Sequence, residues 1–201
     1  MNVLIIPDKF KGSLTGTEVI DAIEEGLRRF DQEIQTHSIT ASDGGDGFLE
    51  AIRKSHGAVQ TIECETTDPL GRTIPAEYGF DVSKQAAYIE MARASGMELL
   101  TAAERNPLQT STRGTGTLLV DAIGRGAKDI YMGLGGSATN DGGIGIAKAV
   151  GYRFLDRQGT PLSPVGASLE RIESIDDSAV MSELSGVRIH AINDVANPLI
   201  G

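Results

Sequence analysis

The chain has few of the residues from which disulfide frameworks, histidine metal clusters or nucleic-acid surfaces are built. Among 201 residues there is one cysteine, Cys64, with three histidines and no tryptophan. One cysteine excludes an internal disulfide and fits a reducing compartment such as the cytoplasm. The formal net charge is −10. Because no basic surface is available to follow a phosphate backbone, nucleic acid is not expected as a partner.

Membrane segments and several catalytic signatures are absent as well. No run of about 18 apolar residues is present, and the first residues lack the basic leader and apolar segment of a signal peptide. We therefore expect a cytoplasmic protein with no membrane partner. The chain has neither the Gly-x-Ser-x-Gly elbow of acyl-transfer enzymes nor a Gly-x-x-x-x-Gly-Lys-Ser/Thr P-loop. Its histidines are scattered and form no pair at metal-ligand spacing.

Glycine is in excess. The chain has 25 glycines among its 201 residues, whereas the average share of glycine in proteins is about 7%. The densest stretch is residues 133–143 (GLGGSATNDGG), between a predicted strand and a short predicted helix. Glycines let the backbone approach a ligand closely, and free N–H groups ahead of a helix bind anions. Ser137, Thr139 and Asn140 add side-chain hydrogen-bond groups, and Asp141 adds a carboxylate. The stretch predicts a loop that binds a phosphate or a small polyoxygenated substrate.

Strands and helices alternate in the first part of the chain. The apolar run over residues 2–6 predicts a strand buried on both faces of a parallel sheet. Apolar residues at helical spacing follow over 17–30, then a second predicted strand over 34–39 and a helix over 48–55. This order favours a Rossmann-like or flavodoxin-like α/β layer, in which ligands bind beyond the carboxyl ends of the strands.

The pattern changes near residue 66, where we place a boundary between a Rossmann-like segment over 1–65 and a second domain over 66–201. Residues 59–65 and 73–80 predict antiparallel strands joined by the turn TTDPLGR, and residues 86–89 continue them. No regular element is predicted over residues 166–177. The later predicted elements are helices over 117–125 and 144–150 and strands over 129–134 and 187–192.

Two polar segments follow the first two predicted strands. The first contains Lys11, which can neutralise a carboxylate or phosphate, together with Ser13. The second, SDGGDG over residues 42–47, carries Asp43 among glycines and resembles a metal-binding turn. It lacks the ligand string and terminal glutamate of an EF-hand. A plain solvated loop also fits the first segment, and the second segment is a weak signal when it is taken by itself.

Two further polar segments come later in the chain. Residues 106–116 (NPLQTSTRGTG) place hydroxyl groups around Arg113 ahead of a predicted helix, where a plain capping loop is the alternative. Asp194 follows the last predicted strand. A carboxylate at such a position can accept a proton from a substrate hydroxyl.

The pattern G-x-G-x-x-A, typical of dinucleotide binding, also fits residues 133–138. Asp156 lies near the distance expected for a ribose-binding acid. An NAD-dependent hydroxyacid dehydrogenase is therefore an alternative function. In that fingerprint the helix begins within the glycines, whereas the TNDGG sequence over 139–143 is a poor helix start. We therefore expect the helix here to begin after that stretch.

Taken together, these segments resemble the type I glycerate kinase family. They are long, and they run in the family's order across essentially the whole chain. The matching segments are PDKFKGSLT (7–15), SDGGDGF (42–48), IEMARASGMELL (89–100), RNPLQTSTRGTGTLL (105–119), GLGGSATNDGGIGIAKAVGYRF (133–154) and NDVANPLIG (193–201).

The resemblance implies Mg²⁺-assisted transfer of a phosphoryl group from ATP to a hydroxyl of D-glycerate, commonly giving 2-phosphoglycerate. It implies a Rossmann-like α/β domain and a second α/β domain with a mixed sheet, with the active site in the cleft between them. It also implies catalytic roles for Lys11, Asp43 and Asp194, with either aspartate as metal ligand or as the base. Substrate- or phosphate-binding roles are implied for Ser13, Thr110, Arg113, Gly114, Thr115, Gly116, Gly135, Gly136, Ser137, Thr139, Asn140 and Asp141.

The chain departs from the family pattern at two positions and in length. KFKGS stands where SFKGS is usual, and NDV stands where CDV is usual, while Asp194 is kept. Family members continue into a Gly-Pro-Gln-Lys-Gly segment, so the chain resembles about the first half of the family. Three functions stay open: a glycerate kinase, a non-catalytic remnant that binds small molecules, and the dehydrogenase. Besides D-glycerate, the expected partners are a separate C-terminal half or a second copy of the chain.

Overall fold

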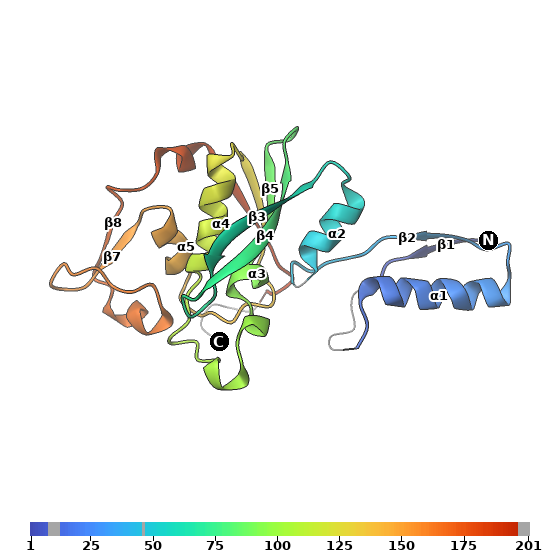
Figure 1. The fold of residues 1–201 in the computed structure, drawn as a ribbon, viewed down its shortest axis with the longest axis horizontal. Coiled ribbons are helices and arrows are strands. Elements are labelled where there is room, and N and C mark those ends of the chain that lie inside the picture. The colour runs from blue at the N-terminus through green and yellow to red at the C-terminus, as the bar shows by residue number, and fades with distance from the viewer. Residues whose placement is uncertain (8–12, 46, 197–201) are drawn as a thin grey trace.

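The protein has two units of unequal size (Figure 1). The computed structural model describes residues 1–7, 13–45 and 47–196. The smaller unit consists of three elements, which are β1 (Asn2–Ile5), α1 (Gly16–Phe30) and β2 (Gln35–Ser38). The two strands pair in parallel, with Leu4 opposite His37, and α1 lies alongside them.

The start of α1 is set by a reciprocal pair of hydrogen bonds. The Glu18 N–H donates to Thr15 Oγ1 at 3.2 Å, and the Thr15 N–H donates to Glu18 Oε2 at 2.7 Å. This capping box satisfies two backbone donors that have no partner inside the helix. The same hydrogen bonds hold the pKa of Glu18 below its usual range.

The larger unit is built on a five-stranded mixed sheet, which confirms the predicted α/β class with a mixed second sheet. The strand order is β3-β4-β5-β6-β9. Strands β3, β4 and β5 pair antiparallel, whereas β5, β6 and β9 pair in parallel. The bounds are β3 (Gln60–Thr67), β4 (Thr73–Asp81), β5 (Ala86–Glu90), β6 (Asp129–Gly133) and β9 (Arg188–Ile192).

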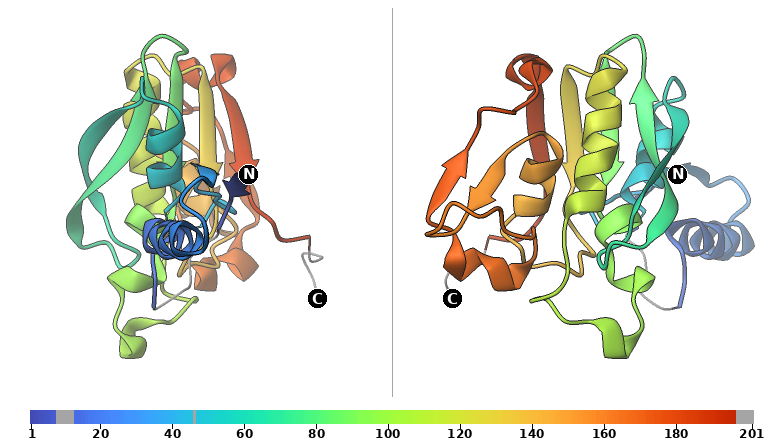
Figure 2. Two further views of the ribbon diagram at one scale, coloured as in Figure 1. Left: turned by 90° about the vertical axis from the view of Figure 1, so that its right-hand side faces the viewer. Right: turned by 60° about the vertical axis from the view of Figure 1, so that its left-hand side comes forward.

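Helices pack on both faces of this sheet (Figure 2). On one face lie α4 (Arg113–Gly124) and α5 (Ile144–Ala149), and on the other lies α2 (Phe48–Ser55). The main core lies between the sheet and α4, where Leu118 and Ile130 are completely buried. A smaller core joins α2 to β5. Burial of these apolar side chains is the main stabilising contribution to the larger unit.

Short elements complete the larger unit. α3 (Ala92–Ser95) follows β5, and β7 (Arg153–Leu155) pairs antiparallel with β8 (Ser174–Asp176). Residues 166–177, for which no regular element was expected, contain the 3₁₀ turn Gly166–Arg171 and β8. The other 3₁₀ turns are Met97–Leu99, Ala102–Glu104 and Ser182–Gly186.

The first strand differs from its prediction. Residues 2–6 were expected to be buried on both faces of a sheet, yet Leu4 is 58% and Ile6 is 53% exposed, while Ile5 is buried. The reason is that β1 belongs to a two-stranded sheet with a single helix beside it. A second layer of structure, which would cover Leu4 and Ile6, is not supplied by the described residues.

The proposed division of the chain at residue 65 would cut through β3, whose residues 60–67 all pair with β4. The helix α2 also packs against β4 and β5 of the larger sheet. We therefore propose that the boundary lies earlier, in the segment between β2 and α2.

Candidate active site

Three loops meet beyond the carboxyl ends of β6 and β9. The Gly135 N–H donates to the carbonyl oxygen of Gly44 at 3.0 Å, and the Leu134 N–H donates to that of Ile192 at 3.1 Å. A Cβ on Gly44, whose φ is +87°, would lie 2.2 Å from the Ile192 oxygen. Only glycine at this position allows such a close backbone approach. The polar segments after β2, β6 and β9 are thereby brought together.

The two predicted catalytic aspartates belong to this meeting point. Asp43 is half-buried one residue before Gly44, and its Oδ1 accepts the Gly45 N–H at 2.8 Å. Asp194 is exposed two residues beyond β9. Because Gly44 packs on Ile192, both carboxylates stand at the same edge of the sheet. Lys11, the third predicted catalytic residue, lies outside the described residues.

The glycine-rich loop is held against the segment that follows β5. The Ala138 N–H donates to the Ser95 oxygen at 2.8 Å, and the Met97 N–H donates to the Gly136 oxygen at 3.0 Å. Gly136 has φ of +73°, in the left-handed region that glycine tolerates best. Of the predicted binding residues in this loop, Gly135, Gly136, Ser137 and Thr139 are half-buried, and Asn140 is exposed.

Asp141 joins the glycine-rich loop to the start of α4. Its carboxylate is 1% exposed and accepts the N–H groups of Thr112, Gly143 and Gly145 at 2.8, 3.0 and 3.2 Å. It also accepts the Thr112 hydroxyl at 2.9 Å. The buried Thr110 hydroxyl adds a hydrogen bond to the Ala138 oxygen at 2.8 Å. These contacts show Asp141 and Thr110 holding two loops together, and their ligand contacts stay a prediction.

The helix α4 begins at Arg113, four residues before the predicted start. The N-cap residue Thr112 makes no side-chain capping bond, so the Thr112–Asp141 contacts organise this end instead. Gly114, Thr115 and Gly116 are buried in the first turn, where a Cβ on Gly114 would lie 1.9 Å from the Thr67 oxygen. The glycines thus permit close packing, and only Arg113 of this predicted group is exposed.

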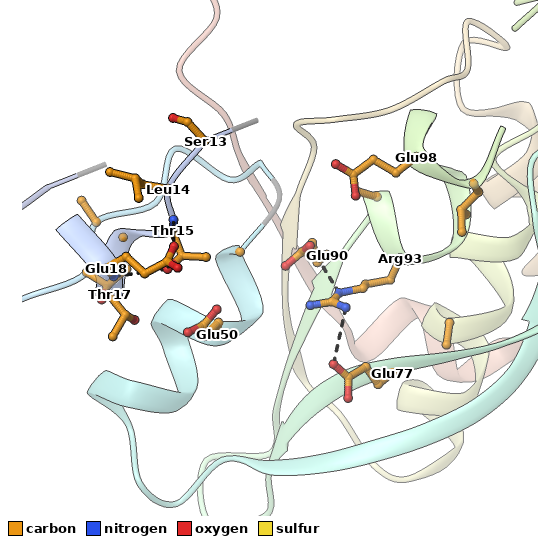
Figure 3. Close-up of a pocket in the computed structure, with 18 of the residues that line it drawn as sticks. Ser13, Leu14, Thr15, Thr17, Glu18, Glu50, Glu77, Glu90, Arg93 and Glu98 are labelled. Carbon is orange, nitrogen blue, oxygen red and sulfur yellow. Dashed lines mark hydrogen bonds and ion pairs between the residues drawn. The ribbon is translucent and has the colours of Figure 1, made fainter. Parts of the chain in front are cut away.

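A cleft of about 840 Å³ opens between the two units beside these loops (Figure 3). One side is formed by residues 13–18 and Glu50, so the predicted residue Ser13 lines the cleft. The facing side carries Glu77, Glu90 and Arg93 from β4, β5 and α3. The cleft lies next to the glycine-rich loop, because Gly96 in its wall forms a β-bridge to Ser137.

Glu90 connects the cleft wall to α2. It is 2% exposed at the carboxyl end of β5, and its Oε2 accepts the Leu49 N–H at 3.0 Å. The N-cap Gly47 has no side chain to provide a cap, so Glu90 satisfies this donor from across the sheet. Arg93 Nε lies 3.4 Å from Glu90 Oε1, and Arg93 Nη1 lies 3.8 Å from Glu77 Oε1.

Sequence reasoning did not single out the cleft residues Glu77, Glu90 and Arg93. A usable signal existed for two of them, because Glu90 and Arg93 fall within IEMARASGMELL, one of the segments on which the resemblance depends. Glu77 gave no such signal, since it stands in an alternating strand with no motif around it.

The donor types at the loop junction suit magnesium. The described residues contain no group of three or more His, Cys, Asp or Glu side chains arranged to hold a metal ion. Mg²⁺ is commonly held by one or two carboxylates, with water and phosphate oxygens as the remaining ligands. Asp43 and Asp194 fit that requirement by residue type and by their position at one sheet edge.

A second hollow of about 490 Å³ lies on the α2 side of the sheet, and none of the predicted site residues lines it. Tyr88 and Tyr131 stack in its floor with ring centroids 5.3 Å apart. The His190 ring stacks on that of Tyr131 with centroids 4.6 Å apart, and His190 Nε2 lies 3.0 Å from Asp129 Oδ1.

Within the described part of the chain, no helix is long and apolar enough to cross a membrane.

Comparison with known proteins shows to which family the chain belongs. The sequence matches the Glycerate kinase family over residues 3–201. The chain belongs to this family. It is 43% identical to a glycerate kinase of Halalkalibacterium halodurans, a match that covers 100% of this chain and 53% of that protein. It is 42% identical to a glycerate 2-kinase of Escherichia coli K12, covering 100% of this chain and 52% of that protein.

A solved structure supports the same assignment for the fold. The crystal structure of a Salmonella typhimurium LT2 protein provisionally named glycerate kinase 2 matches with a TM-score of 0.83 and 41% identity. The match covers 100% of this chain and 54% of that one. This glycerate kinase family chain therefore spans about half the length of the relatives it matches.

The structure also bears on the dehydrogenase alternative. α5 begins at Ile144, as expected from the sequence, and not within the glycines of residues 133–138. The glycines thus lack the strand–turn–helix setting that the dinucleotide fingerprint requires. This geometry argues against the dinucleotide-binding interpretation of the loop.

Proposed function

We propose that this chain carries the phosphoryl-transfer site of a glycerate kinase, which uses ATP and Mg²⁺ to phosphorylate D-glycerate, with 2-phosphoglycerate as the product. The observation that carries the proposal is the junction of three strand-end loops next to a cleft. There, glycine N–H groups and two aspartates stand together. Phosphoryl transfer depends on positioning and charge stabilisation more than on covalent chemistry, and such a junction provides both.

Phosphate groups are proposed to bind at the glycine-rich loop and the start of α4. Backbone N–H groups of Gly136 and Ser137 are suited to phosphate oxygens, whereas the Gly135 N–H already donates to the Gly44 oxygen. Arg113 is exposed at the N-terminal end of α4, where its charge adds to that of the helix dipole. Lys11 and Ser13 are proposed to contact the carboxylate or phosphate from the other side of the cleft.

Asp43 and Asp194 are proposed to divide two tasks, metal binding and proton acceptance. As the glycerate hydroxyl oxygen forms its bond to the γ-phosphorus, the bond from that phosphorus to the ADP oxygen breaks, and the hydroxyl proton passes to a carboxylate. Magnesium would supply charge stabilisation on the phosphate oxygens. Each aspartate is a candidate for the base, because each belongs to a loop of the junction.

A second candidate function is small-molecule binding without turnover. It is favoured by one observation, that the glycine-rich loop and the start of α4, which are proposed to bind phosphate, both lie within the described residues.

The test is a coupled assay for ADP release from ATP and Mg²⁺, with and without D-glycerate, run beside equilibrium binding of ATP. Glycerate-dependent ADP formation supports the kinase, and ATP binding without turnover supports the second candidate. Arg113→Gln is expected to weaken ATP binding about tenfold or more, because it removes one charge-assisted contact. Arg125→Gln is the matched control, since Arg125 lies at the other end of α4 and pairs with Asp121 at 2.8 Å. Absence of both ATP binding and ADP formation would contradict both functions.

A further inference from the structure

The cleft beside the glycine-rich loop is acidic, with a single basic side chain in its described wall. Six glutamates line it, and Arg93 is the only lysine or arginine among the described residues that do so. A small acid that enters such a cleft is repelled by most of the wall, so it needs a local positive charge. Within the described lining, Arg93 is the residue that can supply this charge.

Arg93 is placed to meet a ligand. It belongs to α3, directly after β5, and its side chain is 41% exposed. Its guanidinium lies between the carboxylates of Glu90 and Glu77 (Figure 3). Two residues later, the Ser95 oxygen accepts the Ala138 N–H of the glycine-rich loop at 2.8 Å. The same short helix therefore carries a cation of the cleft and an attachment point of the loop that is proposed to bind phosphate.

The two carboxylates beside Arg93 direct its side chain without engaging its hydrogen-bond donors closely. Arg93 Nε lies 3.4 Å from Glu90 Oε1, and Nη1 lies 3.8 Å from Glu77 Oε1, whereas a well-formed N–H···O bond measures about 2.7–3.2 Å. The shorter contacts of these glutamates go to other groups. Glu77 Oε2 lies 3.1 Å from Arg53 Nη2, and Glu90 Oε2 accepts the Leu49 N–H at 3.0 Å. Arg93 thus keeps N–H donors for a ligand.

The chemistry of the guanidinium favours a carboxylate as that ligand. Its planar fork of N–H groups matches the two oxygens of a carboxylate in a bidentate arrangement. Phosphate oxygens also suit arginine, but phosphate is proposed to bind at the glycine-rich loop and at Arg113. The charge of the acid substrate that remains to be matched is its carboxylate.

We propose that Arg93 binds the carboxylate of the acid substrate, and that the surrounding glutamates restrict the cleft to acids with a single negative charge. Glu90 and Glu77 are positioning residues, because they direct the guanidinium and do not touch the substrate. A second carboxylate on the ligand would meet no second cation among the described lining residues and would be repelled by exposed glutamates such as Glu98. The inference rests on the proposed function for the identity of the acid, but its test needs no turnover.

The experiment titrates the chain with small acids and follows the arginine Nε–Hε signals by heteronuclear NMR. The Arg93 signal, assigned by its loss in Arg93→Lys, is expected to shift with D-glycerate. It should also shift with D-lactate, which keeps the carboxylate but lacks the terminal hydroxyl. Glycerol, which has no carboxylate, should leave the signal in place. Inorganic phosphate should shift backbone signals of the glycine-rich loop and not the Arg93 signal.

Variants separate a ligand contact from a structural ion pair. Arg93→Gln is expected to weaken D-glycerate binding about tenfold or more, because it removes a charge-assisted contact. Arg93→Lys keeps the charge without the fork, so its affinity should fall between those of the wild type and Arg93→Gln. ATP affinity should be nearly unchanged in both variants. Arg171→Gln is the matched control, because Arg171 is exposed, does not line the cleft, and forms a similarly long ion pair of 3.6 Å with Asp156.

Tartronate tests the restriction on charge. It has a second carboxylate in place of the hydroxymethyl group of glycerate, and it is expected to bind about tenfold more weakly because of the like charges around it. Glu98→Gln removes one of those charges and should reduce the difference about twofold at low ionic strength. Glu170→Gln is the control, since Glu170 is exposed and does not line the cleft.

A shift of the Arg93 signal with both monocarboxylates, together with weaker binding by Arg93→Gln and not by Arg171→Gln, supports the proposal. Arg93 is not the carboxylate site if neither acid shifts its signal, if Arg93→Gln binds D-glycerate as tightly as the wild type, or if that variant loses ATP binding instead. Tartronate binding as tight as that of D-glycerate would overturn the restriction on charge.

The coupled assay separates this inference from the proposed function. Glycerate-dependent ADP formation that Arg93→Gln leaves unchanged would overturn the role of Arg93 while the kinase proposal stands. D-Glycerate binding at Arg93 without ADP formation would leave the carboxylate site standing and remove the turnover.

Discussion

The two units of this protein contain the same kinds of elements but differ in what those elements bury. In the larger unit, α4 and the sheet enclose Leu118 and Ile130, both fully buried. In the smaller unit, a strongly apolar strand leaves Leu4 and Ile6 more than half exposed. Capping and periodicity are enough to specify a helix and two strands, whereas burial requires a second layer. The difference indicates that the larger unit contains most of the buried core and is the stable framework.

The largest expected effect compares one apolar side chain from each unit. Ile130→Ala should lower the free energy of unfolding by about 2–5 kcal/mol, because it leaves a cavity in a packed core. Leu4→Ala, at an exposed position, should change it by about 0.5 kcal/mol or less. Chemical denaturation of both variants measures the contrast. Equal losses of unfolding free energy in the two variants would mean that Leu4 is as well buried as Ile130. That result would contradict the contrast between the two units.

The next-largest effect concerns the hydrogen bonds of Asp141, which join the glycine-rich loop to the start of α4 in the larger unit. Asp141→Ala should lower the free energy of unfolding by about 3 kcal/mol, because three N–H groups and one hydroxyl lose a buried acceptor. Faster amide hydrogen exchange at Thr112, Gly143 and Gly145 should accompany the loss. Asp156→Ala is the control, since Asp156 also accepts backbone N–H groups, but in a surface turn. An equal effect of the two variants would show that the Asp141 contacts do not organise the loops.

A smaller effect tests whether the two units unfold together. Thr15→Ala removes the N-cap of α1 and should destabilise that helix by about 1 kcal/mol. If the smaller unit is only loosely coupled to the rest, amide exchange should rise over residues 16–38 and stay unchanged in β4, β5 and β6. Glu25→Ala, which removes an exposed ion pair with Arg29 and leaves the N-cap intact, is the control, because exposed pairs of this kind contribute little to stability. A uniform rise across both units would contradict loose coupling.

The smallest effect is electrostatic and belongs to β6 and β9 of the larger unit. The Arg188 guanidinium and, next, His190 lower the pKa of Asp129 to about 2 from an ordinary value of 3.8. Because the folded-state pKa is the lower one, the stabilisation is complete above pH 3.8 and is lost as the pH falls through about 2. Arg188→Gln should raise the pKa of Asp129, as measured by NMR titration of its carboxyl carbon. An unchanged titration would show that the ion pair is not maintained in solution.

Most elements of the fold could be predicted because their signals are local. The helix over 48–55 was predicted to the residue, and α5 begins at the predicted Ile144. The start of α4 was missed by four residues because it depends on contacts between Thr112 and the distant Asp141. The exposure of β1 could not be predicted either, since an apolar sequence does not record whether its covering layer is present.

The candidate site was predictable by segment and less so by side chain. Glycine-rich loops after strands pointed to the junction of Gly44, Gly135 and Ile192, although no local pattern predicts which loops touch. In the sequence, Asp141 and Thr110 resemble ligand-binding groups. In the structure, both form hydrogen bonds to neighbouring loops. The role of Glu90 could be found only from the structure, because its hydrogen bond with Leu49 joins residues 41 positions apart in the sequence.

The most direct test of the proposed site is chemical-shift mapping of the chain by heteronuclear NMR, with Mg²⁺–ATP and then D-glycerate added. The account predicts that the largest shifts occur together at Asp43–Gly45, at Gly133–Ser137 and at Asn193–Asp194, the three loops that meet. Shifts centred on Tyr88 and Tyr131 in the second hollow, with the three loops unaffected, would contradict it.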